Sequence, residues 1–254
     1  MRILVSNDDG IRAPGIEILA EAARSISSDV WMVAPDRKWT AASHHLSFDR
    51  DLTLTSVRER VYACSGTPAD CIVAAMSILF AKDPKPELVL AGVNDKRNVA
   101  EDIAYSGTMA IAREAVFWGI PAIAVSKTNG VTDRPGELAA LRELLPLFWN
   151  SRRDWVAEGH WLSVNLPASL PASLAQARIG RDKIAGACDV SETTAERVTY
   201  RIRRGRPGTH SPGDENALID GGRVTIVRHR GYAEAALPET LVEAWNDAIR
   251  RPAP

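Results

Sequence analysis

Oxygen-bearing side chains gather in three loops, each of which follows a short apolar run. "MRILV" leads into "SNDDG", "VWMVA" leads into "PDRKWT", and "LVLA" leads into "GVNDKRN". Apolar runs of this length predict buried strands. In an open parallel sheet, the loops at the carboxyl ends of the strands meet at one edge, where ligands bind. We therefore expect the polar residues of these loops to form one site.

The first loop places two carboxylates side by side, and Asp8 and Asp9 are the candidate catalytic residues. Neighbouring side chains on a regular strand point to opposite faces, so sharing one ion requires a turn, which Gly10 permits. Without a cation the two charges would repel and raise the pKa of one carboxyl. Together with the hydroxyl of Thr40 and the amide oxygen of Asn94, the ligands are all oxygen, which suits Mg²⁺ or Mn²⁺ rather than zinc. An ordinary solvated turn is the alternative for "DDG" alone.

The stretch "YSGT" directly precedes an apolar helical pattern. Ser106 and Thr108 supply hydroxyls, Gly107 permits close approach, and the amides at a helix start have no partner within the helix. Together they predict a cradle for a phosphate group. An ordinary helix cap explains the same residues. "GTPADC" has the same two interpretations, and a Thr67 cap followed by Pro68 is the favoured one.

Two further groups of residues have weaker links to the chemistry. His44 and His45 lie in a loop near Thr40, where a histidine could hold a phosphate or donate a proton to a leaving hydroxyl, although exposed loop histidines are common. The C-terminal part carries Arg201, Arg203, Arg204 and Arg206. These arginines could steer an anionic substrate, but a solvated face or a subunit contact is the favoured interpretation.

The rest of the first half alternates strand-like runs with helical patterns. The expected strands are 3–5, 30–34, 88–91, 122–125 and 161–166, and the expected helices are 16–26, 68–79, 108–117 and 138–148. Residues 52–55 and 61–63 alternate in polarity and predict an antiparallel pair at a sheet edge. This order predicts an α/β fold with a mostly parallel, doubly wound sheet.

The pattern changes from about residue 185. An alternating stretch at 198–202, a turn-rich segment, a short strand at 224–227 and a terminal helix at 237–249 follow. We expect a single domain, 1–254, with a core of about 1–185 and a C-terminal arm of hairpin and helix over about 186–254.

Composition limits the classes of function. The chain has 254 residues, 45% of them hydrophobic, and a formal charge of -1. This balance argues against a nucleic-acid polymer or a membrane as the main partner. The first residues already resemble a strand and no run of about 18 apolar residues occurs, so we expect a soluble, cytoplasmic protein. Cys64, Cys71 and Cys188 lack the spacing of a zinc site and are expected to be buried, reduced thiols.

A set of motifs occurs in a fixed order: "MRILVSNDDGIRAPGI", "VAPDR", "GTPADC", "LVLAGVN" with Asn98, "YSGTMAIAREA", "GIPAIAVS" and "SVNLP". As a set they closely resemble the SurE family of stationary-phase survival proteins, over most of residues 1–167 and weakly again at 214–227. The resemblance implies a Rossmann-like three-layer sandwich that hydrolyses nucleoside 5'- and 3'-monophosphates with a metal, some members also degrading short polyphosphate. It also implies a homodimer or homotetramer whose C-terminal arms are exchanged between subunits.

Carried over by position, the resemblance also implies the site residues. The metal ligands would be Asp8, Asp9, Asn94 and, where the family usually has serine, Thr40. The residues lining the phosphate pocket would be Asn98, Ser106, Gly107 and Thr108. One divalent cation per subunit, Mg²⁺ or Mn²⁺, is implied.

The chain departs from the family pattern at several positions. Thr40 and Ala41 stand where Ser-Gly is common, Lys96 and Ala100 stand where glycines are common, and "RRGRPG" replaces a frequent aromatic-glycine pattern. Thr40 keeps the hydroxyl but adds a stiff methyl group, so we expect metal binding with shifted geometry. The ammonium of Lys96 would either bind phosphate or crowd the pocket.

The leading hypothesis is a metal-dependent phosphomonoesterase that needs no covalent nucleophile, and a phospho-aspartyl route through Asp8 has less support. One alternative is a nucleotide-binding protein of the same fold with weak or lost activity, motivated by Thr40, Lys96 and Ala100. Another is a phosphatase with a shifted substrate preference. A dinucleotide-dependent oxidoreductase would require "GxGxxG" after the first strand, where this chain has "NDDG".

Overall fold

The structure is a computed structural model that describes residues 1–128, 134–232, 238–240 and 245. Its centre is a nine-stranded sheet with the order β3-β4-β2-β1-β5-β6-β7-β11-β8. The strands are β1 (Arg2–Ser6), β2 (Asp29–Pro35), β3 (Leu54–Arg58), β4 (Val61–Cys64), β5 (Leu88–Asn94), β6 (Ala122–Lys127), β7 (His160–Leu166), β8 (Leu174–Gln176) and β11 (Val224–Arg230). The predicted terminal helix at 237–249 falls largely outside the described residues.

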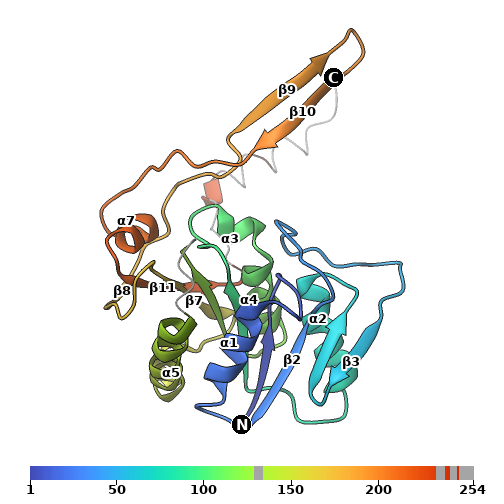
Figure 1. The fold of residues 1–254 in the computed structure, drawn as a ribbon, viewed down its shortest axis with the longest axis vertical. Coiled ribbons are helices and arrows are strands. Elements are labelled where there is room, and N and C mark those ends of the chain that lie inside the picture. The colour runs from blue at the N-terminus through green and yellow to red at the C-terminus, as the bar shows by residue number, and fades with distance from the viewer. Residues whose placement is uncertain (129–133, 233–237, 241–244, 246–254) are drawn as a thin grey trace.

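Helices cover both faces of this sheet and enclose two apolar cores (Figure 1). One face carries α1 (Pro14–Ala23), α5 (Arg134–Asn150) and α6 (Arg152–Trp155). The other carries α2 (Pro68–Ala74), the π-helical turn η1 (Ala75–Leu79) and α4 (Gly107–Phe117), which short α3 (Asp102–Tyr105) precedes. The fold is therefore the predicted α/β fold with a mostly parallel central sheet.

The central strands have apolar residues on both sides because both faces are covered. On β1, Ile3 and Val5 pack in the core beneath α1 and α5, whereas Leu4 packs in the core beneath α2 and α4. All of β5 is buried. The carboxyl ends of β2, β1 and β5 lie next to one another because these strands pair in parallel.

Most predicted elements are present, with shifted ends. At the sheet edge, β3 pairs antiparallel with β4, which confirms the predicted excursion. The strand predicted at 88–91 continues to Asn94, and the helix predicted at 138–148 begins at Arg134 and contains Pro146. One expectation is wrong: Cys188 is exposed on β9, although Cys64 and Cys71 are buried free thiols as predicted.

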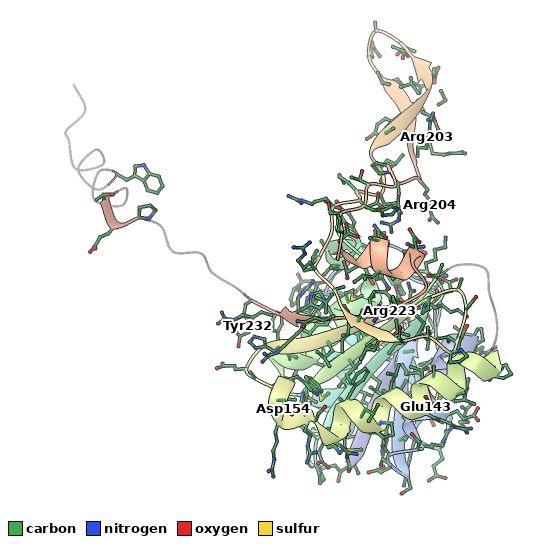
Figure 2. All side chains as sticks on the ribbon, turned by 90° about the vertical axis from the view of Figure 1, so that its left-hand side faces the viewer. Glu143, Asp154, Arg203, Arg204, Arg223 and Tyr232 are labelled. Atoms are coloured by element: carbon green, nitrogen blue, oxygen red, sulfur yellow. The ribbon has the colours of Figure 1, made fainter. Side chains whose placement is uncertain are left out.

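The segment after residue 185, predicted as one arm, consists of two parts. Strands β9 (Ala187–Thr193) and β10 (Val198–Arg203) pair only with each other and form a hairpin that projects from the body (Figure 1). Arg203 and Arg204 lie on this projection, away from the sheet (Figure 2). Helix α7 (Glu215–Asp220) and β11 return to the body, where β11 pairs with β7 and β8. Among the described residues, no helix is long and apolar enough to cross a bilayer.

Candidate functional site

The three polar loops meet at the carboxyl edge of β2, β1 and β5. The backbone amide of Trp39 donates to the carbonyl of Asp8 at 2.7 Å, which joins the second loop to the first. The ammonium of Lys38 pairs with the carboxylates of Asp9 and, at 3.1 Å, of Asp95. One lysine therefore holds all three loops together, and the donors predicted from separate segments share one edge of the sheet.

Asp8 is buried, 7% exposed, and faces the first turn of α4. The hydroxyl of Thr108 donates to its Oδ1 at 2.6 Å. A Cβ added to Gly107 would lie 2.7 Å from the Cβ of Asp8, so only glycine allows this approach. Burial, and then the neighbouring Asp9, raises the pKa of Asp8 to about 6, although the bond from Thr108 acts in the opposite direction. A nearby cation would relieve this penalty.

Asp9 has different surroundings, because its carboxylate pairs with Lys38. Burial lowers the pKa of Lys38, but the bonds to Asp9 and Asp95 outweigh it and raise the pKa above its ordinary value. Sequence reasoning concentrated on Lys96 and missed Lys38. The available signal was its position in the same loop as Thr40, between two acidic loops.

The two other predicted ligands, Asn94 and Thr40, have different surroundings. Asn94 is buried at the end of β5, and its side-chain nitrogen donates to the carbonyl of Lys96 at 2.6 Å. This bond fixes the amide and leaves its oxygen, Oδ1, as an acceptor. Thr40 is exposed and follows Trp39, whose backbone amide is bonded to the carbonyl of Asp8. Lys96 is exposed, and its effect on phosphate binding stays a prediction.

The predicted phosphate cradle lies at the start of α4, next to Asp8. The Ser106 hydroxyl accepts from the amide of Met109 at 3.2 Å, so it caps the helix. The amides of Gly107 and Thr108 begin the helix, where no preceding turn can accept their hydrogen bonds. The helix start thus combines a structural cap with donors that an anion could use.

Asn98 is buried and held from two sides. Its side-chain nitrogen donates to the hydroxyl of Ser126 at 2.9 Å, and its backbone amide donates to the Asn165 side chain at 2.9 Å. These bonds tie the loop after β5 to β6 and β7. Its role in phosphate binding stays a prediction.

The oxygen donors of the predicted site fit a hard cation, although only two of them are carboxylates. Within the described residues, no group of three or more His, Cys, Asp or Glu side chains is placed to hold a metal ion. In the predicted set, Asp8 and Asp9 would be the charged ligands, and Asn94, Thr40 and water would complete the shell. Because all these donors are oxygens, the set suits Mg²⁺ or Mn²⁺, which keep several waters in such sites.

The side chains of His44 and Thr67 have structural partners, whereas His45 is exposed. His44 contacts Glu114 of α4 at 2.7 Å and stacks on Phe117, which fixes its loop against the helix well beyond the first turn. Thr67 and Asp70 form a reciprocal capping box at the start of α2. The helix-cap interpretation of "GTPADC" is therefore confirmed.

Two of the four C-terminal arginines form ion pairs, and the other two, Arg201 and Arg204, are exposed. Arg203 pairs with Asp189 across the hairpin. Arg206 pairs with Asp102 of α3 and, at 3.7 Å, with Asp182. Arg206 therefore joins the base of the hairpin to the body and does not lie on a solvated face.

Several known proteins are similar to this chain in sequence and in fold. A family model described as "Survival protein SurE" matches residues 3–186. A relative from Azorhizobium caulinodans named "5'-nucleotidase SurE" is 33% identical over 243 residues, which cover 89% of this chain and 91% of that protein. A relative of the same name from Methylorubrum populi is 51% identical over 134 residues, 53% of this chain. The chain spans about half the length of that second relative, 52%.

A solved structure is similar over the whole fold. The structure titled "Crystal Structure of Sure Protein from Aquifex aeolicus" superposes with a TM-score of 0.81 at 26% sequence identity. The match covers 99% of this chain and 100% of that one. It includes the mostly parallel sheet and the helices on its faces.

Proposed function

This chain belongs to the SurE family, and from that premise we propose that it hydrolyses nucleoside 5'- and 3'-monophosphates to nucleoside and phosphate with a divalent cation. Its relatives are named as 5'-nucleotidases, which supports a nucleotidase in general. The observation that carries the finer proposal is the buried Asp8, which lies against the first turn of α4 with Asp9 beside it.

The proposed site contains one Mg²⁺ or Mn²⁺ per subunit, held by Asp8, Asp9, Asn94 and Thr40. A bound cation of this kind polarises a phosphoryl oxygen and orients the attacking water. The amides of Gly107 and Thr108 donate to the phosphoryl oxygens and stabilise their charge. Thr108 also keeps Asp8 in place through its hydroxyl. Positioning and electrostatics then supply the catalysis, as is general for phosphoryl transfer.

We also propose a homodimer or homotetramer that forms through the hairpin. Val190 lies opposite Tyr200 in the β9–β10 register, and Ile202 follows on the same face. Val190 and Tyr200 are each 60% exposed in the single chain. An apolar face of this kind on a projecting hairpin supports contact with a second subunit.

The test of the function is phosphate release from AMP and GMP with and without Mn²⁺, followed by a panel of phosphate esters and divalent ions. We expect release only with a divalent ion, and its loss in the double variant Asp8→Asn/Asp9→Asn. Asp83→Asn, which changes an exposed carboxylate between η1 and β5, is the matched control. Undiminished turnover by the double variant would contradict the proposal.

A second candidate function is nucleotide binding with lost turnover. The pairing of Lys38 with Asp9 favours it, because an ammonium that stays there competes with a metal ion for the carboxylate. This candidate predicts calorimetric binding of AMP with no phosphate release under any divalent ion. Lys38→Ala would then restore metal binding if competition is the cause.

A further inference from the structure

A cavity of about 280 Å³ opens beside Asp9, on the face of the sheet that α1 and α5 cover. Pro14 and Ile18 of α1 and Val93 of β5 supply apolar walls. Lys127 and Glu137 supply charged groups. Asp9, Lys38, Asp95 and Arg134 also line the cavity, so its walls combine apolar and charged groups. Small-molecule sites combine apolar walls with polar groups that fix orientation, and this volume is near their lower limit of about 300 Å³.

The cavity and the phosphate cradle lie on opposite sides of the carboxylate pair. Asp8 contacts Thr108 and adjoins Gly107 on the α4 side, whereas Asp9 lines the cavity on the α1 side. A phosphoryl group bound at the carboxylate pair on the Asp9 side would therefore have the cavity next to it. The part of a phosphate ester beyond the phosphoryl group, its leaving group, would extend into that space.

The polar groups of the cavity are held firmly in place. Lys127, the last residue of β6, pairs with Glu137 in the first turn of α5 at 2.6 Å, with side chains 15% and 5% exposed. A lysine ammonium has three donors, and this bond uses one. Within the described residues, Glu137 Oε2 has no hydrogen-bond partner. A nearly buried ion pair is costly to desolvate. The remaining donors of Lys127 and the Oε2 atom of Glu137 are the polar groups that this pair offers to a molecule in the cavity.

We infer that this cavity binds the nucleoside leaving group of the substrate, with Lys127 donating to the sugar oxygens and Glu137 acting as a positioning residue. The inference rests on the proposed function and adds a specificity site to it. The apolar walls contact the sugar and base, and the limited volume selects one nucleoside over a polymer. Phosphate esters without hydrogen-bond acceptors in the leaving group lack the Lys127 contact.

The test compares AMP with phenyl phosphate, whose leaving group offers no acceptor beyond the ester oxygen. In Lys127→Met we expect kcat/KM for AMP, relative to phenyl phosphate, to fall about tenfold or more, because a hydrogen bond from a charged donor is lost. The change should appear in KM for AMP and not in kcat. Glu137→Gln should shift the same ratio in the same direction by a smaller factor. Lys82→Met, an exposed lysine between η1 and β5, is the control and should leave the ratio as in the wild type.

Binding of adenosine, which has no phosphate, separates this inference from the proposed function. Calorimetry without metal should detect adenosine binding to the wild type and weaker binding to Lys127→Met, even if neither ester is hydrolysed. If Lys127→Met lowered kcat/KM equally for AMP and phenyl phosphate, so that their ratio stayed as in the wild type, the inference would be overturned. Adenosine binding that is unaffected in both Lys127→Met and Glu137→Gln would overturn it too. Absent hydrolysis of both esters by the wild type would instead contradict the proposed function.

Discussion

At the scale of single residues, the two adjacent carboxylates of "DDG" have different surroundings. Asp8 is buried against α4 and receives the Thr108 hydroxyl, whereas Asp9 is paired with Lys38 beside the cavity. The turn at Gly10, with φ +104°, follows directly. A positive φ of this kind favours glycine, so the turn that separates the two carboxylates from the helix α1 depends on that residue.

Gly107→Ala tests how closely α4 must approach Asp8. The added Cβ would lie 2.7 Å from the Asp8 Cβ and 2.9 Å from the Pro68 Cγ, so Asp8 must shift. A shift of about 1 Å in a reacting geometry lowers turnover about a hundredfold. The rate of phosphate release from AMP measures this loss of turnover. Gly205→Ala is the control, because a Cβ at that position meets nothing within 4 Å. Equal activity of the two variants would show that this approach is unimportant.

His229→Gln tests a buried histidine that the site does not use. Burial, reinforced by Arg113, lowers the pKa of His229 to about 4, and its ring stacks on Trp161. A folded pKa below the ordinary value of about 6.5 favours the neutral ring, so its contribution to stability is complete above pH 6.5 and is lost as pH falls toward 4. The loss amounts to about 3 kcal/mol, at about 1.4 kcal/mol per pKa unit. The free energy of unfolding, measured with urea between pH 4 and 7.5, should depend less on pH in the variant than in the wild type. An equal pH dependence in the two proteins would contradict this assignment.

At the scale of elements, the start of α2 connects the helix to the loop that carries the histidines. The amide of Asp70 donates to the Thr67 hydroxyl at 3.2 Å, and the Asp70 carboxylate accepts from the Thr67 amide at 2.8 Å. The same hydroxyl donates to the carbonyl of His45 at 2.6 Å. The Thr67 side chain thus caps the start of the helix and holds the loop.

Thr67→Ala should lower the free energy of unfolding by about 1–2 kcal/mol, because it removes both the helix cap and the loop contact. Chemical denaturation measures the change. Ser77→Ala is the matched control, since its exposed hydroxyl only donates to the carbonyl of Val73 one turn earlier. A loss of equal size in the control would mean that the capping box contributes nothing special.

At the scale of the whole molecule, the hairpin is separate from the sheet that forms the body. Its strands pair with each other alone, whereas α7 and β11, which follow it in sequence, are part of the body. The chain therefore leaves the body, forms the hairpin and returns. This arrangement allows residues of the hairpin to be substituted without disturbing the nine-stranded sheet.

The triple variant Val190→Ser/Tyr200→Ser/Ile202→Ser should convert the proposed oligomer to monomers, because it removes apolar area from one face of the hairpin. Light scattering after gel filtration measures the mass. Val57→Ser, an exposed residue 44% accessible on edge strand β3, is the control and should keep the mass of the wild type. Unchanged melting temperature in the triple variant would show that the body is intact, and an unchanged oligomer would contradict the proposed contact.

Much of the body could be predicted from local patterns. The apolar runs of β1, β2, β5, β6 and β7 identify buried strands, and the helical spacing between them identifies the crossover helices. Element ends were less accurate, as at Asn94 and Arg134, because tertiary contacts extend an element beyond its apolar residues. The exposure of Cys188 was missed because, among the described strands, the two that form its hairpin pair with each other and not with the central sheet.

By itself, the sequence determined which loops carry oxygen donors, because strand length, periodicity and the polar residues after each apolar run are local properties. Only the tertiary structure decided which way each donor faces: Asp8 toward Thr108, Asp9 toward Lys38, and His44 toward Glu114. It also paired Lys127 with Glu137 beside a cavity. Such pairings join residues that are far apart in the sequence. They depend on how strands and helices pack across the sheet, which the spacing of residues along the chain does not specify.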